Sequence, residues 1–265
     1  MEGSIRMAEP VSDSGFSGRQ SAEINLDPDE VARFSALADE WWDPDGSFKP
    51  LHRLNPARLG FIRDQLTIRF GGDIASRRPF DGLAMLDIGC GGGLVCEPMS
   101  RLGGRMTGID ASERNIGTAR SHAERMGLDI EYQHVTAETL VEQGAQYDAV
   151  LSLEVIEHVP DIGRFLTTCG ELVKPGGALI LSTLNRTPKS FLLGIIGAEY
   201  VLGWVPRGTH QWKRFVRPSE LSAGLRSANI RVTDIVGLTY DLKSGEWGIG
   251  KDISVNYMVF AVKSG

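Results

Sequence analysis

From residue 83 onward, short apolar runs alternate with amphipathic segments along the chain. The apolar runs have the length of single strands, and the segments between them have the length of short helices. This alternation is typical of βαβ units, in which helices connect parallel strands. It predicts strands over residues 83–88, 105–110, 129–135, 147–153 and 177–184.

The pattern changes after residue 217. A helix is predicted to begin at Pro218 or Ser219, because proline fits the first turn of a helix. Two apolar runs follow, at 230–238 and 255–262, and the glycine-rich stretch "KSGEWGIG" between them predicts an antiparallel hairpin at the sheet edge. The whole prediction is a Rossmann-like α/β fold with a seven-stranded, mostly parallel sheet and helices on both faces.

Residues 25–265 are predicted to form one domain with two additions to the sheet. Two helices around "WWDPDGSFKPLHRLNPAR" predict an N-terminal helical cap over residues 25–80. An insert over residues 188–212 follows the fifth strand. Residues 1–24 are polar and rich in serine and glycine, which predicts a disordered tail.

Composition and charge narrow the class of protein. The net charge of −6 argues against nucleic acid as a partner, because counterion release needs a basic surface. The three cysteines include no C-x-x-C pair, which points to a reducing compartment and away from structural zinc or a disulfide framework. Residues 1–24 lack the apolar core of a signal peptide, and the chain has no run of about 18 apolar residues. A cytoplasmic location is therefore expected.

The glycine cluster "LDIGCGGG" stands where the first predicted strand turns into a helix. Backbone N–H groups and a helix N-terminus face a ligand at such a turn. A dinucleotide site has the spacing G-x-G-x-x-G, whereas Gly89, Gly91 and Gly93 give G-x-G-x-G with Leu94 in the third place. The sequence therefore predicts a ligand other than a dinucleotide.

Two carboxylates follow the ends of neighbouring predicted strands. Asp110 comes 21 residues after Gly89, where it can accept two hydrogen bonds from a ribose diol. Its alternative role is a cap for the following helix. Asp87, two residues before Gly89, either orders the turn or faces a ligand ammonium group. Together with the glycines, these carboxylates predict a pocket for an adenosyl ribose.

The same residues carry a resemblance. "LDIGCGGG", "GID", "LSLEVIEHV" and "LVKPGGALILST" resemble the successive motifs of class I S-adenosylmethionine-dependent methyltransferases. "FSALADEWWDPDGSFKPLHRLNPAR", "STLNRTPKS", "GAEYVLGWVPRGTH", "KRFVRPSEL" and "DISVNYM" resemble the ubiquinone-biosynthesis O-methyltransferase family, over roughly residues 25–262. The resemblance implies methyl transfer from S-adenosylmethionine to a phenolic oxygen of a polyprenyl catechol. The alternatives are a methyltransferase for another small phenol or amine, and a non-catalytic assembly factor with this fold.

The resemblance also implies a set of cofactor contacts at Arg58, Gly89, Asp110 and Leu153. Arg58 would hold the methionine carboxylate with both arms of its guanidinium. The alternative for Arg58 is an exposed position on a helix. Asp87 and the backbone of Gly91 complete the contacts expected around the methionine and ribose.

Two further features near the expected cofactor site stay open on the sequence alone. Thr136 stands where many methyltransferases have an aspartate, so the adenine amino group would be held by the backbone or by Glu138. Trp41 and Trp42 pack either over the cofactor as a lid or in the core.

The motif "LEVIEHV" supplies the expected catalytic groups. Glu154, Glu157 and His158 would share one face of a helical turn, because they are three and four residues apart. There they could hold Mg²⁺, which would favour the phenolate, and the resemblance implies a divalent metal at these positions. The alternatives are a metal-free general base, His158, oriented by a carboxylate, and a purely structural junction.

The predicted insert has an unusual composition. Residues 191–205 carry a single charge, Glu199, and are too few to span a bilayer. Between residues 185 and 217, six basic residues stand against this one acidic residue, in a chain of net charge −6. This pattern predicts that residues 188–212 dock on an anionic membrane surface, with peripheral association to the inner membrane beside other ubiquinone-biosynthesis enzymes. The alternative is a buried helix over the substrate pocket, and both are compatible with a polyprenyl tail.

Overall fold

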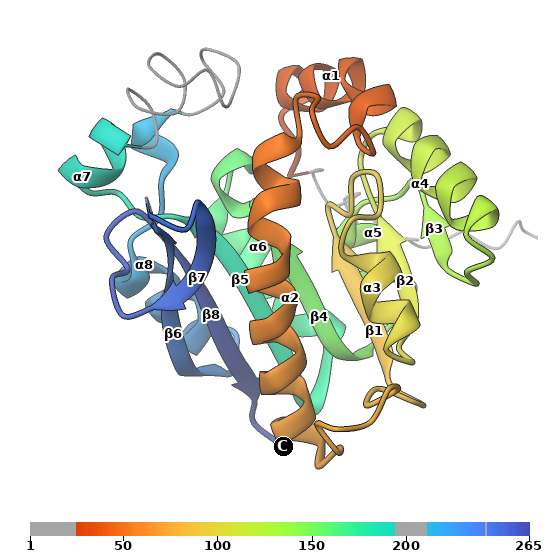
Figure 1. The fold of residues 1–265 in the computed structure, drawn as a ribbon. Coiled ribbons are helices and arrows are strands. Elements are labelled where there is room, and N and C mark those ends of the chain that lie inside the picture. Colours follow the sequence, from red (N-terminus) through yellow and green to blue (C-terminus); the bar gives the residue numbers. More distant parts are fainter. Residues whose placement is uncertain (1–24, 194–210, 242) are drawn as a thin grey trace, which may run out of the picture.

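The computed structural model describes residues 25–193, 211–241 and 243–265. The predicted tail at 1–24 and residues 194–210 of the predicted insert lie outside the described residues. Within the described part of the chain, eight strands form one sheet in the order β3-β2-β1-β4-β5-β8-β6-β7 (Figure 1). The first five strands of this order pair in parallel, and the remaining pairs are antiparallel.

All seven predicted strands are present, and the sheet has one more. In chain order the strands are β1 (Ala84–Ile88), β2 (Arg105–Ile109), β3 (Glu131–Gln133), β4 (Tyr147–Leu153), β5 (Val173–Leu184), β6 (Ile230–Asp241), β7 (Glu246–Gly250) and β8 (Asn256–Lys263).

The prediction of seven strands missed one strand, β7, at the edge of the sheet. β6 and β8 pair antiparallel as expected, but the stretch between them folds back and forms β7 against β6. Gly245 has a φ of +74° in this turn, and Tyr240 is paired with Trp247 across the two strands. The sequence pattern hid β7 because glycines interrupt its apolar residues.

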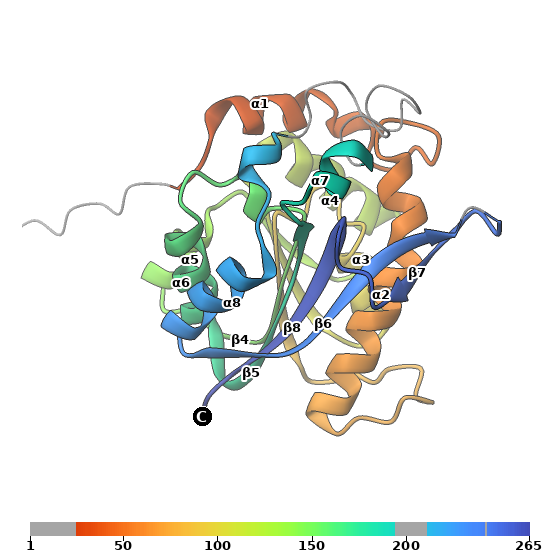
Figure 2. The ribbon, with the colours of Figure 1, turned by 90° about the vertical axis from the view of Figure 1, so that its left-hand side faces the viewer.

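Helices cover both faces of the sheet, as predicted (Figure 2). The buried side chains of one face pack against α2 (Lys49–Phe70), α3 (Cys96–Arg101) and α4 (Glu113–Arg125). Those of the other face pack against α5 (Ala137–Glu142), α6 (Ile162–Leu172) and α8 (Pro218–Ser227).

Residues at the ends of these helices fix where each helix begins and stops. Ser112 caps α4, because its hydroxyl oxygen accepts the N–H of Asn115 at 3.2 Å. Gly127 follows α4 with a φ of +66°, a left-handed conformation that glycine adopts without strain. Pro218 is the first residue of α8, as predicted.

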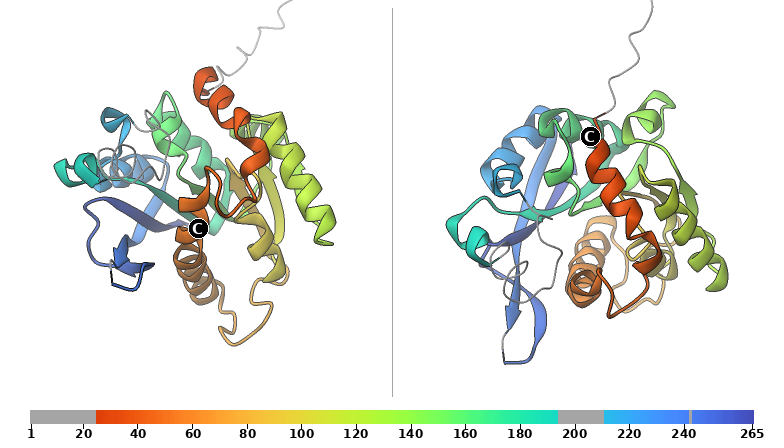
Figure 3. Two further views of the ribbon diagram at one scale, coloured as in Figure 1. Left: turned by 45° about the horizontal axis from the view of Figure 1, so that its top comes forward. Right: turned by 90° about the horizontal axis from the view of Figure 1, so that it is seen from above.

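The N-terminal segment lies across the end of the molecule at which the parallel strands end (Figure 3). It consists of residues 25–48, with α1 (Pro28–Ala36) and the 3₁₀ helix η1 (Ala38–Glu40), and α2 then runs from this end along one face of the sheet (Figure 1). Three short helices stand near the same end: η2 (Ile156–His158), α7 (Pro188–Ser190) and η4 (Trp212–Arg214). None of the helices in the described ranges is long and apolar enough to cross a bilayer.

Candidate active site

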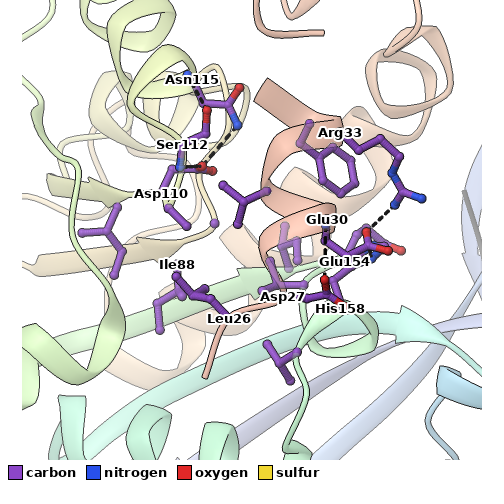
Figure 4. A pocket seen from close by; sticks show the side chains of 18 of the residues that line it. Leu26, Asp27, Glu30, Arg33, Ile88, Asp110, Ser112, Asn115, Glu154 and His158 are labelled. Carbon is purple, nitrogen blue, oxygen red and sulfur yellow. Dashed lines mark hydrogen bonds and ion pairs between the residues drawn. The ribbon is translucent and has the colours of Figure 1, made fainter. Parts of the chain in front are cut away.

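A cavity of about 530 Å³ lies between the carboxyl ends of the parallel strands and α1 (Figure 4). Gly89, Asp110 and Leu153, which follow or end β1, β2 and β4, line one part of it. Leu26 and Phe34 line it from the N-terminal segment. Ligands of open α/β sheets bind at this edge, so the cavity is the candidate active site.

Most of the residues predicted for the site line this cavity. Those that do are Gly89, Asp110, Glu138, Leu153, Glu154, Glu157 and His158. Arg58, Asp87 and Gly91 belong to the layer behind the lining. The cavity therefore brings four of the predicted cofactor contacts together with the three predicted catalytic groups.

The glycine loop has the conformation that its spacing predicts. Gly89, Gly91 and Gly93 have φ values of +74°, +54° and +91°. A Cβ atom at Gly91 would lie 2.3 Å from the ring of Trp41, and one at Gly92 would lie 2.3 Å from the Trp41 Cβ atom. The loop is thus built from glycine for two reasons, the left-handed backbone and the close approach of a tryptophan.

The two adjacent tryptophans both contact the glycine loop. Trp41 lines the cavity and stacks on Phe48 with ring centroids 3.7 Å apart. The indole N–H of Trp42 donates to the carbonyl oxygen of Gly92 at 2.9 Å, and its ring stacks on His122. Trp41 therefore packs in the core and also lines the cavity, and its role as a lid over the cofactor stays a prediction. Trp42 binds the loop through its indole N–H.

Asp110 holds the loop and the start of α4 together. Its Oδ1 accepts the N–H of Ser112 at 2.8 Å and the amide of Asn115 at 3.1 Å, and its Oδ2 accepts the N–H of Gly91 at 3.0 Å. Burial raises the pKa of Asp110. A carboxylate offers about four acceptor positions. One position, on Oδ2, remains for a ribose hydroxyl, and a second hydroxyl would have to displace one of these donors.

Arg58 is buried, which contradicts the alternative of an exposed helix position. Its side chain is 3% exposed, and its NH2 donates to Asn55 Oδ1 at 3.0 Å. Its NH1 lies 4.0 Å from Glu154 Oε1, and its Nε has no hydrogen-bond partner among the described residues. Burial lowers the pKa of Arg58, and the charges of Glu154 and Asp87 oppose that shift. A buried guanidinium with a free donor fits an anionic ligand such as a carboxylate.

Asp87 and Glu138 have different surroundings. Asp87 is buried behind the loop, accepts the thiol of Cys96 at 3.4 Å, and has a pKa that burial raises to about 7. These contacts fit its role in ordering the turn, and its contact with a ligand ammonium stays a prediction. Glu138 lies in the first turn of α5 after the N-cap Thr136 and lines the cavity. Its contact with adenine stays a prediction too.

The helical turn expected for Glu154, Glu157 and His158 is absent, so that expectation was wrong, although all three side chains line the same cavity. Glu154 has a φ of +57°, and its Oε1 accepts the hydroxyl of Ser182 at 2.6 Å. Glu157 Oε2 accepts the hydroxyl of Thr183 at 2.8 Å. Ser182 and Thr183 are neighbours in β5, and burial together with the nearby charge of Glu154 raises the pKa of Glu157 to about 7.

These side chains do not fit the Mg²⁺ site that the resemblance implies. Within residues 25–193, 211–241 and 243–265, no group of three or more His, Cys, Asp and Glu side chains is arranged to hold a metal ion. The physical reason is local. The left-handed backbone of Glu154 ends the strand, and η2 begins only at Ile156, so no regular helical turn spans the motif.

His158 pairs instead with Glu30, a residue that the sequence analysis missed. His158 Nδ1 lies 2.9 Å from Glu30 Oε2, and Phe34 packs edge-on against the imidazole at 5.3 Å (Figure 4). Burial acts to lower the pKa of His158, but the hydrogen bond to Glu30 and the charge of Glu157 raise it. The same hydrogen bond lowers the pKa of Glu30. No sequence signal marks Glu30, because it is one of two acidic residues in the first turn of α1.

Comparisons with known proteins agree with this geometry. Residues 86–181 match the family described as "Methyltransferase domain". The chain is 52% identical over 241 residues to the ubiquinone biosynthesis O-methyltransferase of Azorhizobium caulinodans, covering 91% of this chain and 95% of the relative. It is 55% identical over 240 residues to that of Caulobacter vibrioides, covering 90% and 95%.

A solved structure shows the same fold at low identity. Magnesium protoporphyrin IX methyltransferase from Synechocystis PCC 6803 with bound S-adenosylmethionine has a TM-score of 0.60 and 18% identity. The likeness covers 92% of this chain and all of that one. The predicted Rossmann-like fold is thereby confirmed. By its identity to these relatives, the chain belongs to the ubiquinone biosynthesis O-methyltransferase family, a family of S-adenosylmethionine-dependent methyltransferases.

Proposed function

We propose that this enzyme methylates a phenolic oxygen of a polyprenylated catechol in ubiquinone biosynthesis, with His158 as the general base. The observation that carries the proposal is the His158–Glu30 pair, which lies in the lining of the cavity. A phenol has a pKa of about 10 and is a poor nucleophile at neutral pH. A base within reach of the hydroxyl supplies the nucleophilic phenolate oxygen.

The cofactor half of the cavity is built by the strand ends. S-adenosylmethionine, when bound, supplies an electrophilic methyl group on a positively charged sulfur. Arg58 would bind the methionine carboxylate through its free Nε, and Asp110 would accept a ribose hydroxyl. Gly89 would bring its backbone against the methionine, and Leu153 would pack beside the sulfur.

The acceptor half contains the base in mostly apolar surroundings. Leu26, Val31 and Phe34 of the N-terminal segment line the cavity beside His158. Because Glu30 occupies Nδ1, the Nε2 atom of His158 is the one left to take the proton of the hydroxyl. Glu30 would hold the ring in this tautomer and stabilise the imidazolium that forms. Apolar walls suit an aromatic ring with a hydrocarbon tail.

The choice of acceptor is tested by direct turnover. We expect the purified enzyme with S-adenosylmethionine to methylate a catechol with a short prenyl tail, detected by mass spectrometry. A phenol without the second hydroxyl and an aromatic amine of the same size serve as competing acceptors. Exclusive methylation of the amine would contradict the proposed substrate, and no turnover of any acceptor would favour a non-catalytic role.

Docking on an anionic membrane surface is the second part of the proposed function. Phe191, Leu192 and Leu193 follow α7, and their side chains are 44%, 56% and 49% exposed. The ring centroids of Phe191 and Trp212 lie 6.2 Å apart. Three consecutive exposed apolar residues beside a tryptophan favour a bilayer interface. Residues 194–210 of the predicted docking segment lie outside the described residues.

Ion pairs with acidic residues elsewhere in the chain neutralise part of the positive charge of this segment. Ion pairs connect Lys189 with Asp252, Arg214 with Asp27, and Arg186 with Glu220. Three of the five basic residues that the structure describes between 185 and 217 therefore have acidic partners from other parts of the chain. We infer that docking depends more on burial of apolar side chains, and less on the basic residues, than a count of charges in the sequence suggests.

Liposome flotation tests the docking surface. We expect the wild type to float with anionic vesicles and the double variant Leu192→Asp, Leu193→Asp to stay behind, because two charges would enter the apolar interface. Ile68→Asp is the matched control, since Ile68 is 75% exposed but lies on α2. Rising salt should weaken wild-type binding only in part. A wild type that fails to float at low salt would refute membrane docking.

A further inference from the structure

A chain of hydrogen bonds connects the N-terminal segment to Asp110. The indole N–H of Trp41 donates to Asn115 Oδ1 at 3.0 Å, and Asn115 Nδ2 donates to Asp110 Oδ1 at 3.1 Å. Asn115 is 2% exposed, so water does not compete for its amide. Figure 4 shows Asn115 and Ser112 on the same side of the Asp110 carboxylate.

Only one orientation of the Asn115 amide satisfies both neighbours. An indole N–H can only donate, and an ionised carboxylate can only accept. The amide oxygen must therefore face Trp41, and the amide nitrogen must face Asp110. Trp41 itself is fixed by stacking on Phe48 and by its contact with the glycine loop.

The amide in turn restrains the carboxylate of Asp110. With Asn115 and the N–H of Ser112 both on Oδ1, the free acceptor position lies on Oδ2, next to the bond from Gly91. The side-chain torsion that turns a carboxylate has broad preferences, so such partners determine its direction. Loss of the Asn115 amide would leave each carboxylate oxygen with a single backbone donor, which weakens the restraint on the direction of the carboxylate.

We propose that Asn115 is a positioning residue for ribose recognition, and that through Trp41 it makes the N-terminal segment a determinant of cofactor affinity. The proposal rests on the assignment of Asp110 to the ribose. Asn115 acts through Asp110 and needs no contact of its own with the cofactor. Neither Leu nor Asp can replace it: Leu lacks the donor, and an ionised Asp would repel Asp110.

The test compares S-adenosylhomocysteine with its 2′-deoxy and 3′-deoxy analogues by calorimetry. In the wild type, removal of the recognised hydroxyl should weaken binding by about tenfold or more, as for a hydrogen bond to a charged group. In Asn115→Leu and Asn115→Asp, binding of the parent ligand should weaken and the ratio between parent and deoxy ligand should approach one. Trp41→Phe, which keeps the ring but removes the indole N–H, should give an intermediate ratio.

The ratio separates positioning from general damage. A merely structural defect weakens the parent and the deoxy ligands equally and leaves their ratio at the wild-type value. Variants that fold and keep the wild-type ratio would therefore overturn the role of Asn115 while leaving Asp110 assigned. A wild type that does not discriminate between the ligands would overturn the ribose assignment itself, and the proposal with it.

Discussion

His158→Gln is expected to lower kcat by about 10²–10⁴-fold, the range for loss of a general base, while the affinity for S-adenosylmethionine stays close to that of the wild type. His158 lies on the acceptor side of the cavity, and in the described part of the chain no bond connects it to the residues assigned to the cofactor. Glu30→Gln should lower kcat by a smaller factor, because the imidazole remains but loses its charged partner. Steady-state kinetics with a short-tailed catechol and calorimetry with S-adenosylhomocysteine give the two readouts.

The direction in which kcat changes with pH provides a further test of the base. A base works only when unprotonated, so activity should fall as pH decreases through the pKa of His158. That pKa is raised by Glu30 and Glu157 against the opposing effects of burial and of Arg33. Glu30→Gln removes a negative charge that stabilises the imidazolium, so the acid limb should move to lower pH. An acid limb that stays in place would contradict the pairing of Glu30 with the base.

Chelation distinguishes this base from a metal site. Because Glu154, Glu157 and His158 bind Ser182, Thr183 and Glu30 and form no metal-binding group among the described residues, we expect turnover to survive treatment with a chelator. Loss of turnover that added Mg²⁺ restores would show that the three side chains rearrange around a metal. The base proposal would then fail.

The fold could be predicted because parallel strands and their helices leave a strong alternation in the sequence. The eighth strand could not, since glycines interrupt Trp247 and Ile249 and the strand is fixed by pairing with Tyr240 and Leu238. Local patterns predict elements whose stability is local, such as α4 with its Ser112 cap and Gly127 end. An edge strand is determined by a partner elsewhere in the chain, which local periodicity does not report.

In the candidate site, too, local sequence patterns do not report contacts with distant parts of the chain. The glycine loop and Asp110 could be located because their spacing follows from the strand-to-helix turn. The motif "LEVIEHV" was expected to form a helical turn, but a left-handed residue, Glu154, stands at its start. The partner of His158 comes from α1, which is distant in the sequence, and no pattern within either segment connects them. Pairings across the sheet edge depend on how the N-terminal segment folds over it.

Arg58 should show the largest effect on cofactor affinity. We expect Arg58→Met to weaken binding of S-adenosylhomocysteine by about 10²-fold or more, since hydrogen bonds to charged groups contribute about 1.5–3 kcal/mol each. Arg58→Lys keeps the positive charge but loses the planar fork, so its loss should be smaller. The free Nε of a guanidinium that is 3% exposed is the structural reason to expect a carboxylate there.

A truncated ligand separates this contact from damage to the fold. 5′-Methylthioadenosine keeps the adenosine but lacks the methionine carboxylate, so wild type and Arg58→Met should bind it with similar affinity if Arg58 acts on that carboxylate. Arg58→Met also leaves Glu154 without its nearest positive charge, and thermal unfolding should report any resulting loss of stability. An equal loss of affinity for both ligands would contradict the carboxylate contact, because Arg58 would then support only the packing behind the cavity.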